Sequence, residues 1–367
     1  MKRFLTCLII AMIAFSAFAA INVTIDTITQ YAGPNDPTGL TPEGFAINGA
    51  DEKWFADINA TMSNSFGTAL VNLRMVLPDA KYDGADVEVH SWEIKAKLND
   101  WLKMSIGNTA YEIYAESISW EPIFGAGLFE QGRNRIYFDI VPDFLSDLRI
   151  IAGMSMGQDP KAPWNTLQVA AIYEIPMEMY ISAEFSMIPT EMCLQMYNDG
   201  EAKSFSFQVD YIGTENLDVV AGYSLILADG ALVQHRFDLF GTYSAESFAV
   251  ELYDALLLRL YEGEGIGNRL AGKFTYYMTE KLSPFVSFNW FNNYGYAGEI
   301  GGLAWGDCQL VGPGIGKQLL TADAGLGFSI SDNVYGSIGA NIKVNLSDDA
   351  PEDSFFWSIP LCLTATF

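Results

Sequence analysis

An alternation of apolar and polar residues with a period of two constrains this chain most. Between Met177 and Met187 every odd position is apolar, and the even positions carry Glu, Tyr or Ser. Residues 204–211 and 91–98 repeat this alternation. Successive side chains of a β-strand point to opposite faces, so each of these segments has one apolar and one polar face. The pattern predicts an all-β chain built from amphipathic strands.

The length of the predicted strands separates two kinds of β protein. They run for about 10–12 residues, which suffices to cross a bilayer at the tilt of a barrel, whereas soluble β-sandwiches usually break the pattern earlier. Beyond residue 20, no apolar run reaches the ~18–20 residues of a spanning helix. Short polar turns, such as residues 331–333, alternate with long irregular segments. Together these features favour a transmembrane β-barrel.

The N-terminus has the three parts of a secretory signal peptide. Lys2 and Arg3 precede an apolar stretch, and Ala17-Phe18-Ala19 forms a small-x-small cleavage site. We expect residues 1–19 to be removed after Ala19, leaving residues 20–367 as one barrel domain.

The C-terminus ends in a strand whose alternate residues are apolar. Counting back from the end, these are Phe367, Ala365, Leu363, Leu361, Ile359 and Trp357. The segment resembles the C-terminal strand of bacterial outer-membrane β-barrel proteins, porin-like ones included, which ends in an aromatic residue and serves as their assembly signal. The resemblance implies localisation in the bacterial cell outer membrane, contact with its lipids and recognition by the insertion machinery. Pro360 departs from the pattern because it cannot donate a ladder hydrogen bond.

Counted along the whole chain, the segments that read as strands predict an antiparallel up-and-down barrel of about 18 strands. This number is even, as in other single-chain bacterial barrels. If the first pair of segments lies outside the wall, 16 strands remain. Residues 248–261 are ambiguous, because Leu252, Leu256 and Leu260 also fit an amphipathic helix. With an even number, both ends of the barrel lie on the periplasmic side.

Charge and hydropathy exclude two classes of protein. The formal net charge is −25, and it becomes −27 when Lys2 and Arg3 leave with the signal peptide. A nucleic-acid partner is therefore not expected. Half of the residues are hydrophobic and the mean hydropathy is +0.15, which argues against a disordered acidic chain.

A barrel of 16–18 strands is wide enough to keep an aqueous channel. The alternation predicts a charged lining of Glu178, Glu184, Asp210, Arg236, Asp238, Asp323 and Lys343. This lining predicts passive diffusion of small hydrophilic solutes. It also predicts a preference for cations, unless most of the negative charge lies on external loops. A substrate-specific channel and an adhesin or structural barrel with loop-borne binding are the alternatives.

Two loops are candidates for narrowing the channel. Residues 116–133 form the third external loop, the one that folds inward in the general porins that the chain resembles, and could constrict the channel through Glu116, Glu121, Glu130 and Arg133. Residues 293–318 are rich in Gly and aromatic residues and could plug the lumen or form an exposed contact surface. The same resemblance suggests a homotrimer.

An enzymatic role has little support in the sequence. His90 and Ser91 point to opposite faces of a strand, and His235 sits at an outward position, so no catalytic triad is predicted. No cofactor or metal is expected. Cys193 and Cys308 both fall in predicted external loops, where the sequence leaves their pairing open.

Overall fold

The computed structural model describes twelve stretches of the chain, which carry nineteen β-strands in one sheet. The described residues are 19–34, 43–47, 54–77, 86–108, 135–155, 166–176, 178–189, 201–228, 230–260, 265–293, 318–347 and 355–366. The first ten strands are β1 Ala19–Ala32, β2 Gly44–Ile47, β3 Trp54–Asn64, β4 Gly67–Leu77, β5 Asp86–Lys97, β6 Leu102–Gly107, β7 Arg135–Ile140, β8 Leu148–Ser155, β9 Gln168–Ile175 and β10 Met179–Pro189. The others are β11 Glu201–Thr214, β12 Leu217–Ala228, β13 Ala231–Ser244, β14 Phe248–Arg259, β15 Ile266–Tyr276, β16 Leu282–Asn292, β17 Gln318–Ser331, β18 Val334–Asn345 and β19 Phe355–Thr366.

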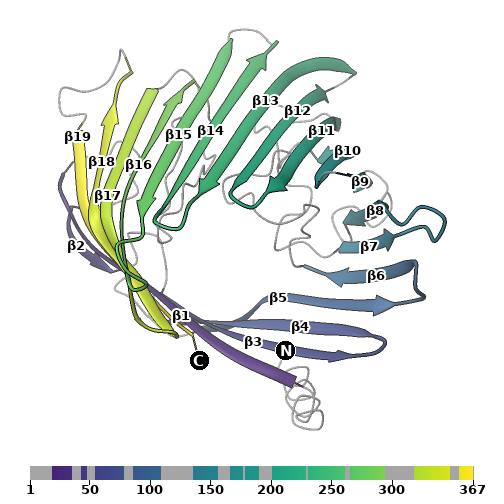
Figure 1. Ribbon diagram of the computed structural model, residues 1–367, viewed down its shortest axis with the longest axis horizontal. Helices are drawn as coiled ribbons and strands as arrows, with labels where there is room; N and C mark the ends of the chain where they lie inside the picture. The colour runs from purple at the N-terminus through teal and green to yellow at the C-terminus, as the bar shows by residue number, and fades with distance from the viewer. Residues whose placement is uncertain are drawn as a thin grey trace.

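The sheet closes on itself through β1 (Figure 1). One edge of β1 pairs with β19, from Thr24 opposite Thr366 to Ala32 opposite Ser358. Its other edge pairs with β3 along residues 19–26 and with the short β2 along residues 29–32. From β3 onward each strand pairs antiparallel with the next one in the chain. The wall therefore contains 18 strands, with β2 as an addition to β1, and the predicted number is confirmed.

The two faces of the wall differ in polarity as the period of two requires. On β11 the outward Phe205, Phe207 and Val209 are exposed in the isolated chain, whereas Ser206 and Gln208 between them are buried on the inner face. A closed barrel leaves no unpaired strand edge, and apolar outward side chains suit contact with lipid. The fold thus presents an apolar surface to a bilayer and a polar surface to its own interior.

Short turns close one end of the hairpins. In the β3–β4 turn the Asn64 side chain accepts backbone hydrogen bonds from Phe66 and Gly67, at 2.8 and 3.1 Å. A Cβ at Gly67 would overlap the backbone carbonyl of Lys95 on β5, so this turn requires glycine. The predicted turn near residue 332 is also formed, because β17 ends at Ser331 and β18 begins three residues later.

Two ambiguous segments belong to the wall. Residues 248–259 form strand β14 and not a helix. A spacing of four residues fits both structures, because it is about one turn of a helix and also twice the two-residue period of a strand. Leu252 and Leu256 accordingly lie together on the outer face of β14. The first segment is β1, whereas β2 was not predicted. No helix in the described stretches is long and apolar enough to cross a membrane. Residues 1–18 lie outside these stretches, so the signal peptide stays a prediction.

Candidate functional site

The candidate site is the inner wall of the barrel, where six of the seven predicted lining residues lie. Five of them are buried there: Glu184 on β10, Asp210 on β11, Arg236 and Asp238 on β13, and Lys343 on β18. Asp323 on β17 is partly buried. Glu178 is different, because it lies exposed in the turn before β10 with a φ of 55°. It lies outside the strand, where the turn interrupts the alternation that assigned it to the inner face.

Arg236 and Asp238 form the centre of one buried network. They are two residues apart on β13, so their side chains share the inner face. The Nε of Arg236 donates to both carboxylate oxygens of Asp238, at 3.0 and 2.8 Å. The hydroxyl of Tyr253 on β14 donates to Asp238 at 2.7 Å and accepts from Arg236 Nη2 at 3.0 Å. The Asp238 side chain is 0% exposed, so this pair is shielded from solvent.

Arg269 on β15 extends this network toward β16. Its guanidinium lies 5.2 Å from the ring centre of Tyr253 and 5.1 Å from that of Phe291. Its Nε donates to Asn289 Oδ1 at 3.1 Å. Tyr253 and Arg269 were not predicted. The inner face of β14 reads Tyr253, Ala255 and Leu257 and carries no charge, and Arg269 lies on the next strand, β15. An arginine facing aromatic residues on two neighbouring strands is the signal that could have found them.

Asp323 is held by neutral donors. Ser287 Oγ donates to one carboxylate oxygen at 3.1 Å, and Asn341 Nδ2 donates to the other at 2.6 Å. Nearby, the Lys343 ammonium lies 5.0 Å from the ring centre of Phe356 on β19. The inner wall of β16–β19 therefore combines fixed polar groups with an aromatic contact.

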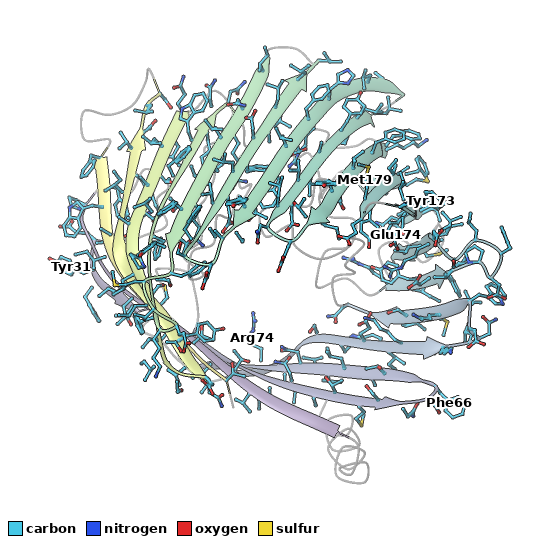
Figure 2. All side chains as sticks on the ribbon, viewed as in Figure 1. Tyr31, Phe66, Arg74, Tyr173, Glu174 and Met179 are labelled. Atoms are coloured by element: carbon cyan, nitrogen blue, oxygen red, sulfur yellow. The ribbon has the colours of Figure 1, made fainter. Side chains whose placement is uncertain are left out.

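The opposite part of the wall contains further charged groups. Arg149 on β8 makes two hydrogen bonds of 3.0 Å to the Asp139 carboxylate on β7. In Figure 2 Arg74 points from β4 into the interior, whereas Tyr31 and Phe66 point away from it. Arg135 is only 1% exposed and donates from Nη1 to the Tyr137 hydroxyl at 2.9 Å. Its Nε and Nη2 have no hydrogen-bond partner among the described residues.

An oxygen-rich group lies on β10 and β11. Both carboxylate oxygens of Glu184 are buried without a hydrogen-bond partner in the described part of the chain. The same holds for the hydroxyls of Ser204 and Ser206 and for the amide oxygen of Gln208. These four residues supply buried acceptors and no positive charge.

Several predicted residues fall outside the described stretches. These are the constriction candidates Glu116, Glu121, Glu130 and Arg133, the loop residues 294–317, both loop cysteines and Phe367. The other residues of the C-terminal signal alternate on β19 with the buried Phe356, Ser358 and Cys362. His235 is on the outer face, where its Nδ1 and the Tyr223 hydroxyl are 2.7 Å apart.

Comparisons with known proteins find no matching family model and no matching curated sequence. Three similar solved structures are all from Pseudomonas aeruginosa. OpdK with vanillate shares 10% identity over 95% of this chain and 98% of that one, with a TM-score of 0.56. OccK3 (OpdO) shares 8% over 95% of each chain, and OccK8 (OprE) shares 8% over 95% and 98%, both with a TM-score of 0.57. The chain therefore has the fold of a bacterial outer-membrane, porin-like β-barrel with 18 wall strands.

Proposed function

We propose that the chain forms a channel in the bacterial outer membrane through which small hydrophilic solutes diffuse passively, with a preference for cations. The observation that carries this proposal is the polarity of the wall, with apolar side chains outside and buried polar side chains inside. Barrels of 16–18 strands are wide enough for an aqueous channel. The outer wall would contact the membrane lipids.

The cation preference is supported by the balance of charge. The chain carries a net charge of −25. On the inner wall Asp238 and Asp139 are neutralised by arginines, but Asp210 accepts its hydrogen bond from the neutral amide of Gln208, at 2.6 Å. Carboxylates that keep their charge inside a channel favour the entry of cations.

The test is the reversal potential of the refolded barrel in a planar bilayer with a KCl gradient. We expect stable openings and a reversal potential shifted toward that of K⁺. The reversal potential of the Asp210→Asn variant should lie less far toward that of K⁺ than the wild-type value does. Glu178→Gln in the exposed turn serves as a control with the same change of charge. A folded barrel that does not conduct contradicts the channel, and a shift toward the chloride potential contradicts the cation preference.

A second candidate is a channel specific for carboxylate solutes. The unpartnered Nε and Nη2 of buried Arg135 favour it, because a guanidinium binds a carboxylate through two donors. The structure of OpdK holds vanillate, an aromatic carboxylate. Vanillate should then block the current of the wild type and not that of Arg135→Gln. Arg149→Gln is the control, because that arginine is already paired with Asp139.

The processing and assembly of the chain complete the proposal. Cleavage after Ala19 would leave Ala20 as the first residue, and mass spectrometry of the membrane-inserted protein measures this directly. The segment from Trp357 to Phe367 would bind the outer-membrane insertion machinery. A homotrimer is the expected assembly, and native mass measurement in detergent distinguishes it from a monomer.

A further inference from the structure

Glu184 is an exception on the inner wall because its carboxylate has no partner. The residue is 5% exposed, and neither oxygen accepts a hydrogen bond from any residue that the structure describes. Burying an ionised carboxylate without a compensating group is costly, so buried acids are normally paired, hydrogen-bonded, bound to a cation or protonated. The side chain therefore calls for a partner that the described protein groups do not provide.

The neighbours of Glu184 supply neutral oxygens and no positive charge. Ser206 lies directly opposite it on β11, and Ser182, two residues before it, lies opposite Gln208. Side chains opposite each other on neighbouring strands have Cβ atoms about 5 Å apart. Gln208 donates its amide Nε2 to Asp210 at 2.6 Å, which leaves its Oε1 without a partner. The hydroxyl oxygens of Ser204 and Ser206 are likewise buried and unpartnered.

No cation on a neighbouring strand neutralises Glu184. The flanking strands β9 and β11 carry no arginine, and Lys203 of β11 lies on the face opposite to that of Ser204 and Ser206. The pairing Glu184–Ser206–Ser224–Arg236 puts Arg236 three strands away, where it is bound to Asp238. Three strand spacings amount to about 14 Å. On the other side, Arg149 of β8 is bound to Asp139 at 3.0 Å. Both arginines thus have an aspartate of their own.

We propose that Glu184, Ser204, Ser206 and Gln208 form a binding site for one monovalent cation, either an alkali-metal ion such as K⁺ or a primary ammonium group. One carboxylate balances one positive charge, and the neutral oxygens complete its surroundings. A divalent ion is less suited, because Ca²⁺ sites use six to eight oxygens that commonly include several carboxylates. The part of this site in ion conduction rests on the proposed channel function, but cation binding itself does not.

The first measurement is thermal unfolding of the barrel refolded in detergent micelles. Chlorides of K⁺, methylammonium and N-methylglucamine, a bulky organic cation, are compared at equal ionic strength. A ligand that binds only the folded state raises the unfolding midpoint, and we expect a rise of about 2–4 °C over N-methylglucamine. A rise with K⁺ alone identifies a metal-ion site, and a rise with methylammonium alone identifies an ammonium site.

Two variants show whether this rise depends on the site. Glu184→Gln keeps the shape of the side chain and should abolish the rise, whereas Ser206→Ala should reduce it. Glu174→Gln is the matched control, because Glu174 lies on the same hairpin at the exposed end of β9, near Met179 (Figure 2). No rise in the wild type, or an equal rise in Glu184→Gln, overturns the proposal.

Conductance then separates this site from the channel function. A unit charge about 4 Å from an ion in water interacts with it by about 1 kcal/mol, which changes the local cation concentration about fivefold. The K⁺/Cl⁻ permeability ratio of Glu184→Gln should therefore be lower than that of the wild type by up to about this factor. The difference should shrink at about 1 M salt, where the screening length is about 3 Å. A wild type that shows the thermal shift but no conductance retains the cation site and contradicts only the channel.

Discussion

The network of Arg236, Asp238 and Tyr253 provides a quantitative test of how the inner wall is held together. The Asp238→Leu variant leaves the guanidinium of Arg236 without its carboxylate, in a position where the Arg236 side chain is only 11% exposed. Breaking one side of a buried ion pair costs about 3–5 kcal/mol, which lowers the ratio of folded to unfolded protein roughly a hundred- to several-thousand-fold. The variant Tyr253→Phe removes two hydrogen bonds but no charge, and should cost about 1–3 kcal/mol.

The double variant Arg236→Met with Asp238→Leu separates charge burial from packing. Replacing both members of a buried pair by apolar side chains is often close to neutral, so the double variant should be more stable than Asp238→Leu alone. The assay is urea unfolding of the refolded barrel in micelles, followed by far-ultraviolet circular dichroism, with the free energy taken from the midpoint and slope. If Asp238→Leu costs less than about 1 kcal/mol, the pair behaves as a solvated surface pair and the reasoning fails.

Further expectations concern single positions. Asp254→Leu should stabilise the barrel in lipid by about 1–2 kcal/mol, because this exposed acid lies midway along the outer face of β14; lower stability in an unfolding titration would contradict this. Gly107→Ala should prevent refolding, judged by gel mobility, because a Cβ there would overlap the backbone of β5. The hydrogen bond and charge of Lys97 lower the pKa of the exposed Asp100, so this ion pair is lost only as pH falls through that lowered pKa. Because an exposed ion pair contributes little to stability, Asp100→Asn should leave the unfolding midpoint at neutral pH unchanged. Phe367→Ala should reduce outer-membrane insertion in cells while refolding in micelles continues.

The inner wall was only partly predictable from the sequence. Glu184, Asp210, Arg236 and Asp238 follow from the alternation alone, because period two assigns each side chain to a face. Glu178 continues the alternation in sequence, but the structure places it in the turn before β10 and not on a strand. Tyr253 and Arg269 were missed because their part in the wall depends on the registers of β13 with β14 and of β14 with β15, which bring residues far apart in sequence together.

The sequence by itself determined the all-β class, the strand number and the polarity of the two faces. Each of these depends on local periodicity, strand length and turn residues, which act within a single hairpin. Only the tertiary structure decided which charges are neutralised. Asp139 of β7 is bound by Arg149 of the neighbouring strand β8 at 3.0 Å, whereas Glu184 faces Ser206. In the described stretches the strands on either side of Glu184 carry no cation on the inner face, because Lys203 of β11 lies on the outer face. Charge pairing across a barrel depends on register and closure, because these set which side chains come within a few ångströms of one another.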